Sequence, residues 1–185
     1  MSRIRFATAR EVFEAFPGVR GDIGAPPTED PPLTFMRALL ESATPEDALS
    51  FCAYVLPRRE AVWWACQCVR TLVPEPGPDG ETALRAAEAW VREPDEPRRR
   101  TALAIGTKAN PRAAQSWVAL AAAWSGGSMN EGENFVPTAP DLTANAARIA
   151  VLTALARVSA RDRAAQLKVC YEGGVRLAMD GRSSE

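Results

Sequence analysis

The sequence predicts an all-α fold, and three observations carry this prediction. Apolar residues recur at spacings of three and four along most of the chain, whereas the alternation typical of a half-buried strand is almost absent. Proline stands at the start of several of these segments, a position that suits a helix. With 185 residues, 46% of them hydrophobic, the chain is long enough for one domain with a substantial core. We therefore expect a single-domain multi-helix bundle, or an irregular array of antiparallel helix pairs, with about eight or nine helices.

The first 32 residues are expected to form a segment distinct from the helical domain of residues 33–185. A short amphipathic helix is predicted over residues 6–16, and Pro17 and Gly18 end it. Its apolar positions are Phe6, Ala9, Val12, Phe13 and Phe16. Residues 18–32 are rich in glycine and proline, which predicts a linker built from turns and extended chain.

Three closely spaced helices are predicted next. Residues 33–42 place four large apolar side chains on one face, namely Phe35, Met36, Leu39 and Leu40. Thr44 and Pro45 then form a helix start, with an N-cap residue followed by proline and acidic residues in the first turn. Pro57 ends that helix and begins another, which is expected to run to Arg70.

The second half of the chain continues the pattern after a turn over residues 74–80. Helices are expected over residues 83–92, 97–108, 110–124, 141–158 and 160–179, with Asn110 and Pro111 as the cap and start of the third. A long loop over residues 125–140 separates the third from the fourth. The 141–158 segment is apolar around its whole circumference, so we expect it to be the central, most buried helix.

The helix that begins at Pro57 carries the first candidate for partner binding. Trp63 and Trp64 are about 100° apart around a helix axis, so at most one can point directly into the core. The other lies at the edge of the core. There it either closes the core, with its indole nitrogen bonded to a carbonyl, or anchors a partner together with Arg58 and Arg59. Arg59 stands four residues before Trp63 and can stack on it as a cation–π pair.

The loop over residues 125–140 carries the second candidate. Connections longer than about 12 to 15 residues without secondary structure are often functional. Its glycine-rich start lacks the lysine and the preceding strand of a phosphate-binding loop. Phe135 and Val136, apolar in mid-loop, indicate that it is pinned either to its own core or to a partner groove. The candidate partner-binding residues are therefore Arg58, Arg59, Trp63, Trp64, Met129, Phe135 and Val136.

The composition argues against most catalytic and metal chemistry. The chain contains no histidine, which excludes imidazole-based nucleophilic systems and imidazole-ligated metal sites. Cys66 and Cys68 point about 200° apart on a helix and cannot chelate one ion together. The four cysteines, Cys52, Cys66, Cys68 and Cys170, are expected to pack between helices as reduced thiols. We expect no catalytic residues, no metal and no cofactor.

Charge and hydropathy restrict the partner and the compartment. A net charge of −1 gives no field that would attract nucleic acid, and the basic cluster Arg98, Arg99 and Arg100 is expected to be a solvated helix end. The N-terminus lacks the apolar segment of a secretory signal, and no segment reaches the length of roughly 18 apolar residues that a membrane-spanning helix needs. We expect a cytoplasmic protein without membrane insertion whose partner is another protein.

Four motifs carry a resemblance to a known family. They are the stretch from Leu56 to Cys66, the stretch from Ala87 to Pro94 with the three arginines after it, residues 123–128, and residues 136–144. Between about residues 33 and 179 the chain resembles an uncharacterised family of small bacterial all-helical proteins. The resemblance implies a gene neighbourhood among type VI secretion genes, near spike, tip and adaptor proteins, and it assigns no enzyme activity and no functional residues.

Three hypotheses follow for the function. The first is a non-enzymatic interaction module, an accessory or adaptor protein that helps to load a type VI secretion effector. The second is an immunity-type protein that binds and blocks a toxin, which requires a patch complementary to that toxin. The third is a carboxylate-dependent enzyme, with Glu60, Glu88 or Glu133 as candidate acids, which requires acids that converge in a pocket.

Overall fold

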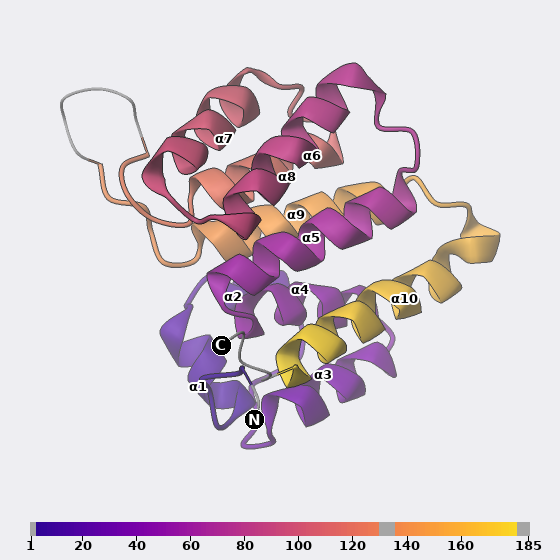
Figure 1. The fold of residues 1–185 in the computed structure, drawn as a ribbon. Helices are drawn as coiled ribbons and strands as arrows, with labels where there is room; N and C mark the ends of the chain where they lie inside the picture. Colours follow the sequence, from indigo (N-terminus) through magenta and orange to yellow (C-terminus); the bar gives the residue numbers. More distant parts are fainter. Residues whose placement is uncertain (1–2, 130–135, 181–185) are drawn as a thin grey trace.

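A computed structural model of the protein describes residues 3–129 and 136–180, and within them the chain forms ten helices (Figure 1). They are α1 (Ala9–Ala15), α2 (Val19–Asp22), α3 (Pro32–Leu40), α4 (Glu46–Val55), α5 (Arg58–Leu72), α6 (Gly77–Arg92), α7 (Glu96–Lys108), α8 (Ala114–Ala123), α9 (Leu142–Leu155) and α10 (Ala160–Met179). In the described ranges the β-structure is one isolated bridge, between Ser128 and Pro137. The all-α prediction is confirmed.

The helices pack in layers around α5 and α9. In Figure 1, α6, α7 and α8 lie on one side of this pair, and α1 to α4 and α10 lie on the other. Helix α9 contacts α8, α5, α4 and α10, so it is the central helix that its all-round apolar sequence predicts. One hydrophobic core therefore runs through the domain.

Small side chains let the central helices approach closely. Half of the residues of α8 are buried alanines, and α9 buries five alanines, Ala144, Ala146, Ala147, Ala150 and Ala154. The same close approach occurs where α10 crosses α4 and α5. A Cβ atom on Gly174 would lie 2.3 Å from Sγ of Cys52 and 3.2 Å from Nε1 of Trp64. Glycine at this position of α10 is thus required by the packing, even though it costs helix propensity.

The N-terminal segment packs on the same core. The core buries Val12 and Phe13 of α1, Phe16 at the C-cap of α1, and Val19 of α2. The backbone nitrogen of Arg3 donates to the carbonyl of Ala178 at 2.9 Å, which joins the start of the described chain to the end of α10. The prediction that residues 18–32 form a linker missed α2, a single turn among glycines and prolines. A domain boundary at residue 32 stays a prediction.

Three predicted helix starts are wrong. Helix α1 begins at Ala9 rather than at residue 6, because the Thr8 side chain caps it and accepts from the backbone nitrogen of Glu11. Helix α6 begins at Gly77 rather than at residue 83, because Gly77 adopts a positive φ of 72° and Pro78 then fits the first turn. Helix α8 begins at Ala114 rather than at Pro111. The side-chain oxygen of Asn110 accepts from the backbone nitrogen of Arg112 at 2.9 Å, and this local turn uses the asparagine before a helix begins.

No described helix combines the length and the apolar character that crossing a lipid bilayer requires.

Candidate partner-binding site

The two tryptophans of α5 have different environments. Trp64 is 0% exposed, and its indole nitrogen donates to the carbonyl of Cys170 on α10 at 2.9 Å. Trp64 is therefore the inward member of the pair, and its indole is closed to a partner. Trp63 is half-buried and lines a depression of about 260 Å³ together with Arg59, Glu60 and Leu177.

The two arginines that begin α5 hold other elements in place. The guanidinium of Arg59 donates to the carbonyls of Val91 at 2.7 Å and Arg92 at 3.4 Å, which are free acceptors at the end of α6. Arg59 thus caps a helix C-terminus. Arg58 reaches in the other direction and donates to the carbonyl of Ser125 at 2.9 Å. This bond ties the start of α5 to the beginning of the long loop.

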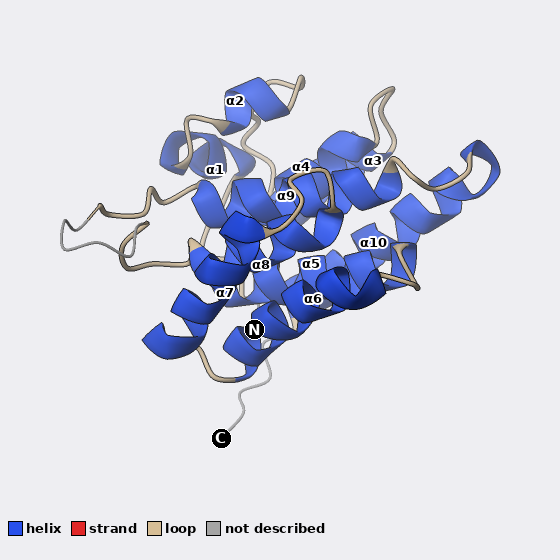
Figure 2. Cartoon of the chain, turned by 90° about the horizontal axis from the view of Figure 1, so that it is seen from above, coloured by secondary structure: helices blue, strands red, loops and turns tan. Residues whose placement is uncertain are grey.

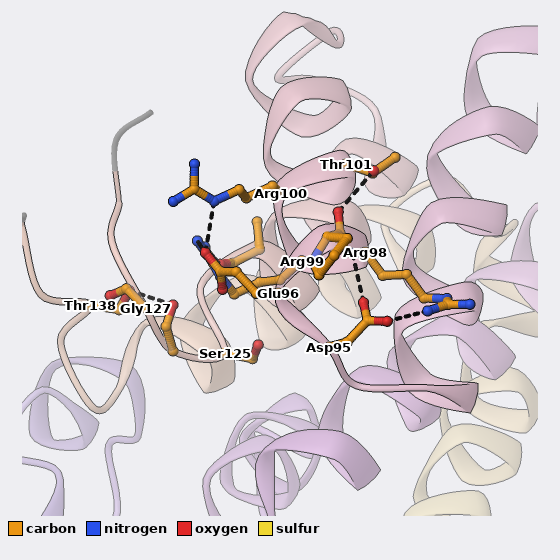
Figure 3. Close-up of polar contacts among 12 residues, drawn as sticks. Asp95, Glu96, Arg98, Arg99, Arg100, Thr101, Ser125, Gly127 and Thr138 are labelled. Atoms are coloured by element: carbon orange, nitrogen blue, oxygen red, sulfur yellow. Dashed lines mark hydrogen bonds and ion pairs between the residues drawn. The ribbon is translucent and has the colours of Figure 1, made fainter. Parts of the chain in front are cut away.

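The long loop has an ordered base made of two short arms. The nitrogen of Met129 donates to the carbonyl of Val136 at 2.8 Å, and the nitrogen of Thr138 donates to the carbonyl of Gly127 at 3.3 Å. The Thr138 hydroxyl lies 3.1 Å from the carbonyls of both Gly126 and Gly127 (Figure 3). We call residues 125–129 and 136–140 the loop base. Its arms extend away from the helices (Figure 1, Figure 2).

Arg99 of α7 contacts both the end of α8 and the first arm of the loop base. It is only 3% exposed, and its guanidinium donates to the carbonyl of Ala123 at 2.7 Å and to both carboxylate oxygens of Glu96 at 2.7 Å (Figure 3). Gly127, at a φ of 67°, lies directly against it, since a Cβ atom there would be 2.9 Å from Nε of Arg99. The guanidinium therefore fixes the end of α8 and the first arm of the loop together.

The basic cluster at the start of α7 is therefore more than a solvated helix end. Arg98 and Arg100 are partly exposed and pair with acids, the latter with Glu96 at 2.8 Å. Arg99 is buried, which corrects the prediction for that residue. Hydrogen bonds from Arg99 and Arg100 lower the pKa of the Glu96 carboxyl to about 2, and the pKa of Arg99 is raised in turn. The sequence does contain a signal of the ion pairs, because Glu96 stands three residues before Arg99 and four before Arg100. It contains no signal of the hydrogen bond from Arg99 to Ala123.

The structure unites some of the candidate residues and separates others. Arg58, Met129 and Val136 all contact or belong to the loop base, where Val136 is 43% exposed. Trp63 lies elsewhere, beside the end of α10. Phe135 falls outside the described residues.

The candidate acids are held by arginines where the structure describes them. Glu60 pairs with Arg3, and Glu88 pairs with Arg70, whose guanidinium also bonds Glu81 at 3.0 Å. These carboxylates therefore join the N-terminal segment to α5, and α5 to α6. Glu133 lies outside the described residues.

The cysteines are buried and unoxidised, as free thiols packed between helices. Burial raises the pKa of the Cys52 and Cys66 thiols, which keeps them protonated and weakly reactive. Cys68 and Cys170 lie together between α5 and α10. Burial, and then a hydrogen bond with Cys170, raise the pKa of Cys68, and the same hydrogen bond lowers the pKa of Cys170. Among the described residues, no group of three or more acids and cysteines is placed to hold a metal ion.

A family model described as a family of unknown function (DUF6931) matches residues 35–178. The chain belongs to this family. The match begins inside α3 and ends in the last turn of α10, so it covers every element that positions the loop base. No curated protein and no solved structure matches the chain.

Proposed function

We propose that this member of the DUF6931 family is a non-enzymatic protein-interaction module that presents its loop base to another protein. One observation supports the proposal most directly. The buried guanidinium of Arg99 holds the loop base, and the loop base exposes an apolar side chain, Val136. Arg99 fixes the first arm, the Ser128–Pro137 bridge fixes the second, and Val136 is 43% exposed between them. Residues held in place before binding lose little conformational entropy on binding, which favours affinity.

The partner we propose is a component of a type VI secretion system, with this chain as an accessory or adaptor that helps to load an effector. The resemblance of the sequence to proteins encoded among type VI secretion genes supports this assignment. Arg58 adds a cation at the start of the loop base, where it bonds Ser125, and arginine and apolar anchors are both enriched in protein interfaces.

The test is an effector-secretion assay in the native host with three forms of the chain. Val136→Glu places a charge on the loop base, and we expect it to lower secretion of the cognate effector and its co-purification with this chain. Val169→Glu is the matched control, because Val169 is 47% exposed but lies on α10. We expect it to behave like the wild type.

The result that would overturn the proposal is equally definite. If deletion of the gene left effector secretion unchanged, the assignment to type VI secretion would be wrong. If Val136→Glu and Val169→Glu both bound the effector as the wild type does, the loop base would not be the interaction surface.

A further inference from the structure

A cavity of about 580 Å³ lies at the opposite end of α7 and α8 from the loop base. The start of α6, the end of α7 and the first turn of α8 form its walls. Its volume is in the range of about 300 to 1,000 Å³ that small-molecule sites occupy. It uses none of the residues that hold the loop base, so the inference drawn from it is independent of the proposed function.

Gln115 is the most informative residue of this cavity. The side chain lines the cavity and is only 5% exposed, yet its amide forms no hydrogen bond with any residue that the structure describes. Its neighbour Ser116 shows the usual behaviour, since its hydroxyl donates to the carbonyl of Asn110 at 2.7 Å. Buried polar side chains nearly always have a partner. The Gln115 amide instead faces the open space of the cavity, where it is available to a ligand.

The chain holds this amide in a defined position. Gly80 of α6 has no side chain, and a Cβ atom there would lie 3.3 Å from Cγ and 3.2 Å from Cδ of Gln115. The side chain of Gln115 thus packs against bare backbone. The turn before α8 is fixed as well, because the indole nitrogen of Trp117 donates to the carbonyl of Pro111 at 2.8 Å. The cavity wall is therefore preformed.

Two opposite charges also line the cavity. Lys108 ends α7 and Asp79 lies in the first turn of α6, and neither forms an ion pair with a described residue. Helix α8 begins with Ala113 as its N-cap, which provides no capping side chain, so its first turn favours an anion. The remaining wall is apolar and includes Ile105.

We propose that this cavity binds a small zwitterion of the amino-acid type, a free apolar amino acid or a short apolar peptide. The carboxylate lies at Lys108 and the first turn of α8, where the Gln115 amide donates to it. The ammonium group lies at Asp79, and the apolar side group lies against Ile105. A zwitterion pairs with both charges and bonds the Gln115 amide in one binding event, whereas a simple anion pairs with Lys108 alone.

The first experiment measures the binding of four probes to the full chain by calorimetry and thermal shift. L-leucine and L-leucyl-L-leucine carry both charges, leucinamide lacks the carboxylate, and 4-methylpentanoate lacks the amine. We expect at least one zwitterion to bind and to raise the Tm, with both single-charge analogues at least tenfold weaker. Binding of leucine alone identifies a free amino acid, and binding of the dipeptide alone identifies a peptide. If neither zwitterion binds at millimolar concentration, the assignment is wrong.

Three substitutions then test the geometry. Gln115→Leu keeps the volume of the side chain but removes the amide, and we expect it to weaken binding of the zwitterion at least tenfold. Lys108→Gln is expected to abolish the preference for leucine over leucinamide. Asp79→Asn is expected to abolish the preference for leucine over 4-methylpentanoate. Lys168→Gln, at an exposed lysine of α10, is the control and should bind as the wild type does.

The two charge variants keep the test decisive even if Gln115→Leu does not fold, because Asp79 and Lys108 are exposed at helix ends. If all folded variants bound leucine with wild-type affinity, the zwitterion would not lie in this cavity.

Discussion

The core around Trp64 and the loop base around Arg99 are held by different forces. Trp64 packs among buried apolar side chains of α4, α5 and α10, and one hydrogen bond satisfies its only polar atom. Arg99 is almost as buried, yet it is held by three hydrogen bonds, two to the carboxylate of Glu96 and one to the carbonyl of Ala123. Apolar burial is non-directional, whereas a buried cation requires acceptors in defined directions. The core is thus held mainly by apolar contact, and the loop base by directed polar contacts.

The largest expected effect is in the core. Trp64→Ala removes a fully buried indole and leaves a cavity, so we expect the free energy of unfolding to fall by about 3 to 5 kcal/mol. Urea denaturation measures this loss.

Trp63→Ala is the matched control, since Trp63 is the adjacent residue and half-buried. We expect a clearly smaller loss. Equal losses for the two variants would contradict the orientation of α5.

The sequence predicted the apolar part of this comparison well. Helical spacing and prolines at helix starts predicted the all-α class and the central position of α9. They also predicted α10 with both its ends, at Ala160 and Met179. The sequence also predicted that at most one of Trp63 and Trp64 points into the core, because the angle between adjacent helical residues is fixed. These features depend on local patterns, which one sequence contains.

The polar part was not predictable in the same way. Arg99 reads as one of three consecutive arginines, and nothing local distinguishes it from Arg98 or Arg100. Its burial depends on where the end of α8 lies, a relation between residues 24 positions apart. The Gln115 cavity was missed for the same reason, since α6 and α8 meet there only in the fold. Helix starts at Gly77 and Ala114 were missed because proline is compatible with both a turn and a first helical turn.

A second prediction concerns the buried cation itself. Arg99→Met keeps a long side chain but leaves the carbonyl of Ala123 without this donor, so we expect a loss of about 1 to 3 kcal/mol in the free energy of unfolding. Amide hydrogen exchange should also become faster across residues 125–129.

Arg100→Met is the control, because Arg100 pairs with the same acid but is largely exposed. We expect its effect to stay within about 0.5 kcal/mol. If the two variants lost the same stability, the hydrogen bonds of Arg99 would not be what holds the loop base.

A third prediction concerns the contact between Arg99 and the loop. Gly127→Ala introduces a side chain at a positive φ and against the guanidinium, and we expect it to cost about 1 to 2 kcal/mol. Thermal unfolding measures the loss.

Gly126→Ala is one residue away, and a Cβ atom there meets nothing within 4 Å. We expect little change in Tm. A loss as large as that of Gly127→Ala would mean that flexibility at this end of the loop, and not its contact with Arg99, determines stability.

The smallest expected effect is a dependence of the free energy of unfolding on the charge of Glu96, and therefore on pH. The pKa of the Glu96 carboxyl is lowered from 4.5 to about 2 by Arg99 and Arg100, so the folded state binds its proton less readily than the unfolded state does. Its contribution to stability is therefore complete above about pH 4.5 and is lost as the pH falls toward 2. Because Glu96 is half-exposed, solvent screening reduces this contribution below what the full shift implies.

The measurement is the difference in the free energy of unfolding between the wild type and Glu96→Gln, followed from neutral to acidic pH. Glu81 also has a pKa lowered to about 2, by hydrogen bonds from Arg70 and Arg85, but it titrates in both proteins and cancels from the difference. We expect the difference to be greatest above pH 4.5 and to shrink toward zero as Glu96 takes up a proton. A difference that did not change with pH would mean that Glu96 supports the loop base through packing rather than through its charge. The contrast with the core, whose apolar contacts do not titrate, would then be lost at this residue.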